Sequence, residues 1–384
     1  MRFFHLSDLH IGLKLFNKDL GEDQEYILNE IIRLAEEYQP DAVIIAGDIY
    51  DKAIPSAEAA LLFDRFVSGL SRTLPSAEIM MISGNHDSAP RVNVFRNVLR
   101  HQHIHMIGIP PQEADEKIEK VTLHDGHGPV NFYLLPFVRP SMVKKAVGQG
   151  EEDEGALSYD ETLRRLIGRE EICPEERNVL VSHQFYVPAH MEADQVERTG
   201  SEIITVGNID QVSADVLEPF DYAALGHIHK PMQVGSEVFR YCGTPLACSV
   251  SEAGQEKGVI MVQMEEKGKV ETEVLPLIPL RKVQVISGSL EEVLLKGCDD
   301  YVTVSLTDRV DLDVIDMQDR IRNAFPNLLE IRRDYQRTAD HGEGYIREEE
   351  QSPFELCRSF LKEMTPGEEE LLRDIINKVQ EETV

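Results

Sequence analysis

Several features that define particular classes of protein are missing from this sequence. Its apolar runs are short, whereas a membrane-spanning helix needs about 20 consecutive apolar residues, so no membrane span is expected. The chain opens without a charged segment followed by a long apolar stretch, so no secretory signal is expected. Its five cysteines are widely spaced and form no CxxC pair. That spacing argues against a disulfide framework or a cysteine-bound zinc and favours a reducing cytoplasm.

Positive charge is also scarce. The chain has 39 Lys and Arg residues against 69 Asp and Glu residues, which gives a formal net charge of −30. A protein that grips nucleic acid by itself usually presents a basic surface, because phosphate neutralisation supplies much of the affinity. Two alternatives stay open here. Either the substrate is not a polymer, or a basic partner and bound metal ions supply the attraction locally.

The length and composition indicate a globular enzyme with more than one domain. The chain has 384 residues, of which 42% are hydrophobic and 28% charged, and such a length exceeds one ordinary hydrophobic core. We expect a main domain over 1–278, a small α/β domain over 279–336, a linker over 337–350 and C-terminal helices over 351–384.

The spacing of apolar residues predicts the secondary structure of the main domain. Helices are expected over 22–38, 56–70, 91–100 and 158–168, with Ser56 as the N-cap of the second. Because helices and short apolar strands alternate up to about residue 110, we expect an α/β fold with parallel strands joined by crossover helices.

The C-terminal part has a different pattern. Residues 281–335 have the pattern of a β-α-β-α-β unit, and two capping boxes begin at Ser352 and Thr365. Each box opens a short amphipathic helix. Two such helices cannot bury their apolar surface on each other alone, so we expect them to dock on a partner.

Each of five short apolar runs is followed directly by histidine, aspartate or asparagine. The runs and the residues after them are 3–6 with Asp8 and His10, 42–46 with Asp48, 79–82 with Asn85, 179–181 with His183, and 222–225 with His227 and His229. Short apolar runs bounded by Gly, Asp and Asn indicate buried strands. In open α/β sheets, functional groups gather at the carboxyl ends of the strands. These seven side chains are therefore expected to converge.

The seven side chains are candidate metal ligands of mixed oxygen and nitrogen type. A single tetrahedral zinc site takes four ligands, so two ions about 3.5–4 Å apart, bridged by a carboxylate, fit better. Asp48 is the natural bridge because it is the carboxylate at its strand end. A donor set without thiolates suits manganese, iron or zinc more than copper.

Three further residues are candidates for roles beside the ions. A two-ion site binds a phosphoryl oxygen and activates water, and the leaving oxygen then needs a proton. His86, next to Asn85, is the candidate general acid. Asp51 is a candidate to orient His86 as a carboxylate–imidazole pair, or is simply a surface carboxylate. Asp87 is expected to hold the GNHD turn by local hydrogen bonds.

These motifs resemble those of the calcineurin-like metallophosphoesterases. The matching stretches are HLSDLH (5–10), AGDIYD (46–51), SGNHDS (83–88), SHQ (182–184) and ALGHIHKP (224–231), followed by YCGTPL (241–246). The residues around the motifs and the C-terminal layout resemble the nuclease subunits of bacterial SbcCD-type complexes. This resemblance implies a four-layer α-β-β-α sandwich with a small α/β cap domain that steers DNA, and with C-terminal helices.

The resemblance also implies a function and a division of the ligands. It implies two manganese ions and a DNA nuclease with 3′-to-5′ exonuclease and single-strand endonuclease activity. The nuclease would act as a homodimer with an SbcC-type coiled-coil ATPase that receives the C-terminal helices. One ion would be held by Asp8, His10, Asp48 and His229, and the other by Asp48, Asn85, His183 and His227, with His86 catalytic.

Two other functions use the same motifs. A stand-alone phosphatase or cyclic-nucleotide phosphodiesterase has the same metal core, but it does not need a cap followed by two free amphipathic helices. A non-enzymatic scaffold that has lost its metals is disfavoured, because all seven candidate ligands are present.

Overall fold

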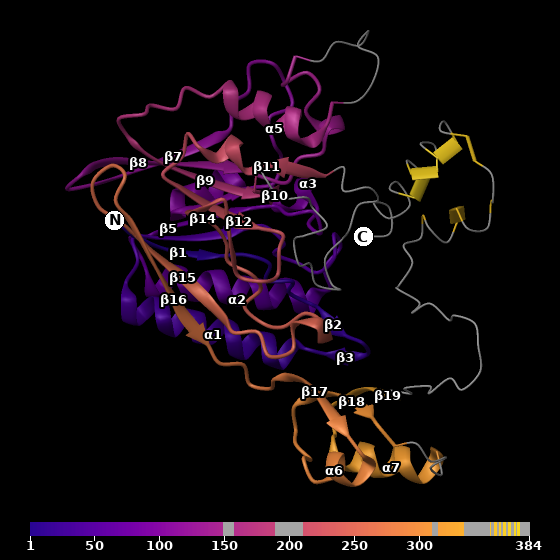
Figure 1. The fold of residues 1–384 in the computed structure, drawn as a ribbon. Helices are drawn as coiled ribbons and strands as arrows, with labels where there is room; N and C mark the ends of the chain where they lie inside the picture. The colour runs from indigo at the N-terminus through magenta and orange to yellow at the C-terminus, as the bar shows by residue number, and fades with distance from the viewer. Residues whose placement is uncertain are drawn as a thin grey trace.

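Two six-stranded sheets form the body of the protein (Figure 1). The computed structural model describes residues 1–148, 157–188, 210–308 and 314–333, and scattered positions between 354 and 376. The first sheet has the order β16 (Val270–Leu277), β15 (Lys257–Met264), β1 (Arg2–Leu6), β4 (Ala42–Ala46), β5 (Glu78–Ile82), β6 (Ile104–Ile107). The second has the order β13 (Met232–Val234), β14 (Ser236–Tyr241), β12 (Tyr222–Gly226), β9 (Arg177–His183), β8 (Gly128–Leu135), β7 (Glu119–Asp125).

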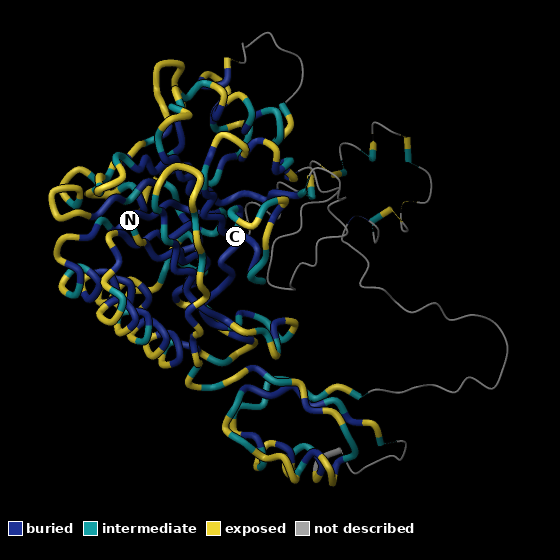
Figure 2. The backbone as a smooth tube through the Cα atoms, turned by 60° about the vertical axis from the view of Figure 1, so that its left-hand side comes forward, coloured by how far each residue is buried: buried dark blue, intermediate teal, exposed yellow. Residues whose placement is uncertain are grey.

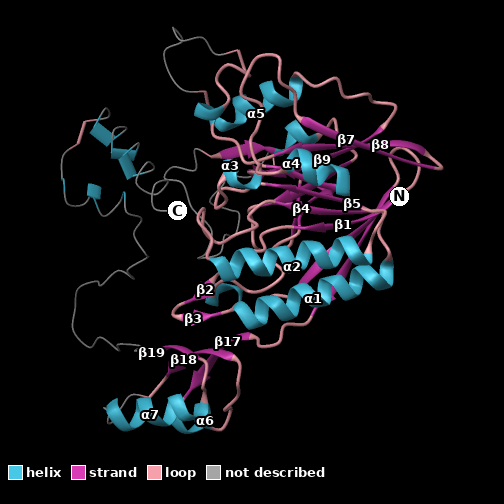
Figure 3. Cartoon of the chain, turned by 180° about the vertical axis from the view of Figure 1, so that it is seen from behind, coloured by secondary structure: helices cyan, strands magenta, loops and turns pink. Residues whose placement is uncertain are grey.

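The sheets pack face to face and carry helices on their outer faces. Side chains of both sheets, among them Phe3 and Ile44 from the first and Phe132 and Tyr222 from the second, share one buried core. Helices α1 (Gly21–Tyr38) and α2 (Ala57–Thr73) cover the first sheet, and α5 (Tyr159–Gly168) covers the second (Figure 3). The layers therefore run α-β-β-α, which confirms the expected sandwich.

Strand direction follows from the connections. Strands β1, β4, β5 and β6 pair in parallel, and so do β14, β12, β9 and β8. The central strands are buried along their length (Figure 2), which explains why they appear in the sequence as continuous apolar runs. Antiparallel pairing occurs towards the sheet edges, where β16 pairs with β15, β15 with β1, β13 with β14 and β7 with β8.

Three of the four predicted helices are confirmed. Ser56 caps α2 by accepting a hydrogen bond from Ala59 N at 3.2 Å, and Ser158 caps α5 through Glu161 N at 3.1 Å. The single helix expected over 91–100 is wrong. The segment instead forms α3 (Ala89–Val92) and α4 (Arg96–Leu99), because Phe95 takes a left-handed φ of 61° that interrupts the helical ladder.

The C-terminal α/β unit (283–333) has the predicted β-α-β-α-β order. Parallel strands β17 (Val283–Gly288), β18 (Tyr301–Leu306) and β19 (Leu328–Arg333) pack against α6 (Leu290–Leu294) and α7 (Val314–Ala324). The unit has its own hydrophobic cluster. It also contacts α1, because Asp23 accepts hydrogen bonds from Arg281 Nη1 and from the Tyr301 hydroxyl, each at 2.8 Å.

Several predictions fall on segments that the structure leaves out. The linker over 337–350, the first capping box except Phe354, and parts of the two C-terminal helices lie outside the described residues. The second capping box is confirmed, because Thr365 N donates to Glu368 Oε2 at 2.8 Å and Glu368 N to Thr365 Oγ1 at 3.4 Å. All five cysteines are free. Among the described residues, no helix is long and apolar enough to cross a membrane.

Candidate metal centre

The strand ends named in the sequence meet at one edge of the sandwich. In the first sheet, Leu6 of β1 lies opposite Ile45 of β4, and Ala46 lies opposite Ile82 of β5. In the second, Gly226 of β12 lies opposite His183 of β9. Strand β4 packs against both β9 and β12. Parallel strands that end at the same level place their following residues together, so the seven candidate ligands converge.

One group of donors joins the end of β1 to the loop after β12. The ligand atoms of Asp8, His10 and His229 lie within 4.8 Å of one another. The Nε2 atoms of His10 and His229 face each other at 3.1 Å. The side chains of all three are buried.

A second group joins β5, β9 and β12 around the amide of Asn85. Its Oδ1 lies 3.0 Å from His183 Nε2 and 2.9 Å from His227 Nδ1. Asn85 is 98 positions from His183 and 142 from His227 in the chain, so the fold brings distant residues into direct contact. The family resemblance implies this group for one ion, but the ligand atom of His183 also lies within 4.8 Å of those of Asp8 and Asp48. The division of the ligands between two ions therefore stays a prediction.

Asp48 lies between the two groups. Its Oδ2 is 3.2 Å from His183 Nε2 in the second group and 3.7 Å from His10 Nε2 in the first. A carboxylate that reaches both groups is what a bridging ligand requires.

The backbone of the site is held in a sparsely populated conformation. Asp8, His10, Asp48 and His227 have φ angles of 52°, 42°, 48° and 102°, and such angles are uncommon for residues other than glycine. Each costs on the order of 1–3 kcal/mol, and such residues cluster at functional sites. Four of the seven candidate ligands share this strain.

Glycines let the loops that follow the strands approach one another closely at the site. A Cβ at Gly84 would overlap Asp48 Oδ1, and one at Gly226 would overlap the carbonyl oxygen of Ala46 and lie 2.7 Å from His183 Nδ1. The glycines in the GNHD and GHIH motifs are therefore needed to bring Asp48 and His183 within reach of their partners.

The buried carboxylates of the site favour a bound cation. Asp8 and Asp48 are 0% and 1% exposed, and among the described residues their ion-pair partners are histidines, not lysine or arginine. Burial raises the pKa of Asp8, although the neighbouring His183 and His229 act in the opposite direction. Two carboxylates buried together without a permanent positive charge are costly, and divalent ions would offset that cost.

The tautomer of His183 points to the same conclusion. Its Nδ1 lies 2.7 Å from the carbonyl oxygen of Ala46, and because a carbonyl only accepts, Nδ1 carries the hydrogen. A neutral ring would then direct the Nε2 lone pair at oxygens of Asp48 and Asn85. Burial alone would lower the pKa of His183, but Asp48, Asp8 and the hydrogen bond to Ala46 together outweigh it and raise that pKa to about 9. A proton thus binds where a metal ion fits, and the donor set suits divalent ions.

His86 lies beside the candidate ligands, and it is half-buried. Its backbone N–H donates to Asp48 Oδ1 at 2.9 Å, and its ring packs edge-on against His10. Its Nδ1 lies 3.0 Å from the backbone carbonyl oxygen of Asp51. The structure therefore replaces the suggested carboxylate–imidazole pair with a contact to the main chain, while Asp51 Oδ1 lies 3.9 Å from His10 Nδ1.

Asp87 holds the GNHD turn, as predicted, and it also binds the loop after β4. Its carboxylate accepts hydrogen bonds from Gly84 N at 2.9 Å and from Ile49 N and Tyr50 N at 3.0 Å. Burial, followed by the charge of Asp48, raises its pKa to about 6. Asp87 thus ties the loop after β5 to the loop after β4.

One contact of the site was not predicted from the sequence. Glu252 Oε1 lies 3.4 Å from Nδ1 of His229, and Glu252 is fully buried. The two residues are 23 positions apart, and Glu252 stands in a polar stretch that matches no motif. No signal in the sequence singled it out.

The fold and the site define a class of protein. A family model described as calcineurin-like phosphoesterase matches residues 1–231, a span that includes all seven candidate ligands and His86. The chain belongs to the calcineurin-like phosphoesterase family, whose members are metal-dependent hydrolases of phosphoester bonds. A second model, SbcD_C, described as a type 5 capsule protein repressor C-terminal domain, matches residues 279–365. The two matches together give the chain an SbcD-like architecture.

Three solved structures are distantly similar to the chain. The TT1561 protein of Thermus thermophilus is 15% identical over 71% of this chain and 98% of its own, with a TM-score of 0.39. A dimetal phosphatase from Danio rerio is 12% identical over 71% and 98%, with a TM-score of 0.39. The calcineurin-like phosphoesterase YfkN from Bacillus subtilis is 14% identical over 71% and 88%, with a TM-score of 0.34. These similarities are too low to transfer any property of those proteins.

Proposed function

We propose that this chain is the nuclease subunit of an SbcCD-type complex, which hydrolyses phosphodiester bonds in DNA. It would act as a 3′-to-5′ exonuclease and single-strand endonuclease in DNA end processing, repair and recombination. The observation that carries the proposal is the combination of a seven-donor phosphoesterase site with a C-terminal segment that matches SbcD_C over 279–365. The free cysteines support the cytoplasm as its compartment.

In this proposal, two divalent ions, taken to be manganese, occupy the site. Asp8, His10, Asp48 and His229 would hold one ion, and Asp48, Asn85, His183 and His227 the other. When bound, such ions polarise a phosphoryl oxygen and make water acidic enough to attack it near neutral pH. The buried side chains exclude bulk solvent around them.

His86 is the proposed proton donor to the leaving oxygen. Because Nδ1 donates to the carbonyl oxygen of Asp51, the ring is held in one orientation and Nε2 is the atom left to exchange a proton with the substrate. A group positioned in this way contributes about 10²–10⁴-fold to the rate. Asp51 would support His86 through its main chain.

The proposed domains divide the remaining tasks. Residues 1–278 would form the nuclease domain, 279–336 a DNA-capping domain, 337–350 a linker, and 351–384 helices that bind an SbcC-type coiled-coil ATPase. With a net charge of −30, the average surface repels DNA, so the partner and a few local cations would supply the affinity.

We also propose that two copies of the chain associate within a heterotetramer. Four large apolar residues are exposed to solvent on α2 and around α3 and α4: Leu61, Val94, Phe95 and Val98. Exposed apolar groups of this kind commonly mark protein interfaces. These residues form the proposed dimer contact.

An activity comparison tests the function. The full chain would be incubated with manganese and either single-stranded DNA or nitrophenyl phosphate, with Asp48→Asn as a control for contaminating nucleases. Cleavage of DNA that is lost in Asp48→Asn supports the proposal. Hydrolysis of the monoester without any DNA cleavage would contradict it and favour a stand-alone phosphatase.

A further inference from the structure

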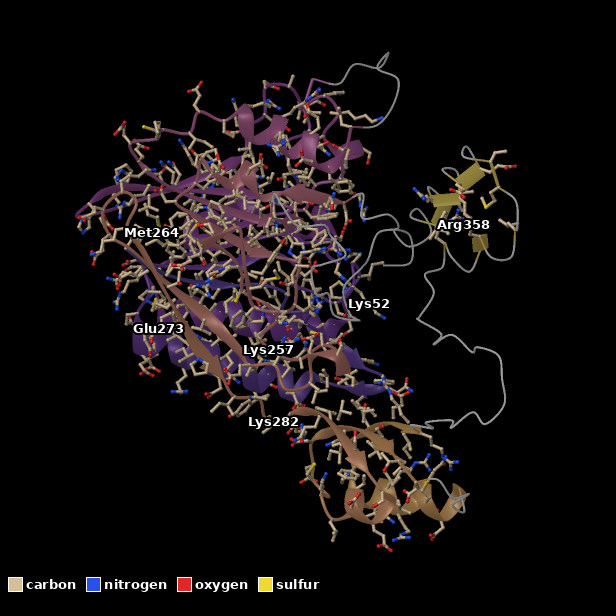
Figure 4. All side chains as sticks on the ribbon, in the orientation of Figure 1. Lys52, Lys257, Met264, Glu273, Lys282 and Arg358 are labelled. Carbon is tan, nitrogen blue, oxygen red and sulfur yellow. The ribbon has the colours of Figure 1, made fainter. Side chains whose placement is uncertain are left out.

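A buried charged cluster adjoins the proposed metal site on the side of His229. It consists of Glu252, at the end of the short 3-10 helix Val250–Glu252, Lys257 at the start of β15 (Figure 4), and Thr244. Glu252 is 1% exposed and Lys257 7%. Charged side chains are almost never buried to this extent unless they are paired. A pair kept in this position needs an explanation beyond packing.

The two carboxylate oxygens of Glu252 have different partners. Oε2 accepts hydrogen bonds from Lys257 Nζ at 2.6 Å and from Thr244 Oγ1 at 3.0 Å. Oε1 faces Nδ1 of His229 at 3.4 Å. Lys257 and Thr244 thus hold the carboxylate in place. Because a carboxylate only accepts hydrogen bonds, Glu252 favours the tautomer of His229 that carries its hydrogen on Nδ1. The lone pair of His229 is then on Nε2, the atom that faces His10.

The main chain of His229 is held by the same cluster. Its carbonyl oxygen accepts from Lys257 Nζ at 3.0 Å and from Thr244 N at 3.2 Å. The chain passes so close that a Cβ at Gly243 would lie 2.6 Å from this oxygen. Lys257 belongs to the first sheet, whereas His229 follows β12 of the second. The cluster therefore fixes His229 across the junction of the two sheets.

We infer that Glu252 and Lys257 are positioning residues for the ion held by Asp8, His10 and His229. Glu252 orients the imidazole, and Lys257 neutralises Glu252 while anchoring the backbone of His229. The inference rests on the proposed metal site. Carboxylates that orient a ligating histidine typically contribute 10–100-fold to metal affinity.

A different interpretation is that His229, Cys248 and Glu252 themselves bind a metal, because their ligand atoms lie within 4.8 Å of one another. Two observations oppose it. Glu252 Oε2 already accepts from Lys257 and Thr244. Burial also raises the pKa of Cys248 well above its usual value, whereas a thiol ligand must be deprotonated.

The test separates orientation of His229 from simple loss of a buried charge. Glu252→Leu/Lys257→Met removes both charges together, so that no buried ammonium is left unpaired. Glu252→Gln/Lys257→Met also removes both charges but keeps an acceptor opposite Nδ1. Thr244→Val keeps both charges and removes one of the two donors that fix Glu252, so it measures the smaller contribution of that hydrogen bond. The readouts are calorimetric titration of the metal-free protein with manganese and its melting temperature.

We expect the wild type to bind two ions. Glu252→Leu/Lys257→Met should weaken one binding step by about 10–100-fold and the other far less. Glu252→Gln/Lys257→Met should recover part of that loss, and Thr244→Val should lose less affinity than Glu252→Leu/Lys257→Met. Melting temperatures confirm that each variant is folded. If the wild type binds two ions and Glu252→Leu/Lys257→Met binds both equally well, this inference alone fails. If the wild type binds none, the inference fails together with the proposed function.

Discussion

His86 is tied to the main chain of Asp51 and not to its carboxylate, with Nδ1 lying 3.0 Å from the carbonyl oxygen. A carbonyl cannot change its charge, so it fixes the orientation of the ring without stabilising a positive charge as strongly as a carboxylate would. His86 is therefore a group whose position is set by the fold, and its proposed role can be separated from that of Asp51 by mutation.

Replacing His86 by glutamine should reduce phosphodiester cleavage by about 10²–10⁴-fold and leave the metal content intact. The reason is that His86 is proposed to exchange a proton and not to hold an ion. Cleavage rates and elemental analysis of the same sample measure both quantities. Because His10, Asp48 and His86 also lie close enough to share an ion, a variant that loses its metals would show instead that His86 is a ligand.

Asp51→Asn should lose much less activity than His86→Gln. The hydrogen bond between His86 and the backbone carbonyl of Asp51 survives this substitution. The substitution removes only the charge of the carboxylate, which lies 3.9 Å from His10 and acts on His86 through space. Steady-state rates of the two variants under identical conditions decide the matter. Equal losses of activity in the two variants would contradict this account and favour a carboxylate–imidazole pair of Asp51 and His86.

Gly226→Ala should destabilise the metal-free protein by about 1–3 kcal/mol, as overpacking of a tight site does. The added methyl group would overlap the carbonyl oxygen of Ala46 and press on His183. Gly126→Ala is the matched control, because no atom lies within 4 Å of a Cβ there. Urea unfolding measures both variants. A Gly226→Ala protein as stable as the control would mean that the close approach is not a constraint.

Asp125→Asn should destabilise the protein by roughly 2–3 kcal/mol. Arg177 is 1% exposed and donates to both carboxylate oxygens of Asp125, so the substitution leaves a buried guanidinium without its counterion. Removing one partner of a fully buried pair costs about 3–5 kcal/mol, and the expected value is lower because Asp125 is partly exposed. Unfolding in urea at pH 7 measures the difference from the wild type.

The same pair predicts a pH dependence. The hydrogen bond from Arg177 is the main cause that lowers the pKa of Asp125. A carboxylate with a lowered folded-state pKa contributes stability that is complete above its unfolded value of about 3.9 and is lost as the pH falls towards the folded value. The difference in unfolding free energy between wild type and Asp125→Asn should therefore be constant from pH 7 to 5 and shrink below pH 4. A difference that grows in acid would contradict this account.

Deleting residues 350–384 should remove binding to the ATPase partner and leave manganese-dependent cleavage unchanged. The deleted segment contains both predicted amphipathic helices and none of the candidate ligands. Co-purification of the partner with the full and shortened chains measures the first effect. Undiminished co-purification would refute the docking role of the helices.

Local patterns in the sequence predict much of the fold. Ser56 as the N-cap of α2, the β-α-β-α-β order of the C-terminal unit and the Thr365 capping box all depend on residues a few positions apart, and all are confirmed. The break at Phe95 could not be predicted from apolar spacing, because Val94 and Val98 keep a helical spacing across it.

The candidate site was likewise predictable in part from the sequence. Its seven candidate donors were predictable because each lies at the end of a strand or in the loop just after it, and strand ends of parallel sheets meet. Asp51 contacts His86 through its main chain, and the sequence cannot distinguish the carbonyl of a residue from its carboxylate as the contact. Glu252 was missed because its contact with His229 arises only when the two sheets pack together.

The central claim is that two neighbouring ions are held between the strand ends. Anomalous diffraction from crystals grown with manganese tests it most directly. We predict two peaks about 3.5–4 Å apart, one contacting Asp8, His10 and His229, the other contacting Asn85, His183 and His227, with Asp48 between them. Peaks elsewhere on the protein, or none within this pocket, would contradict the account.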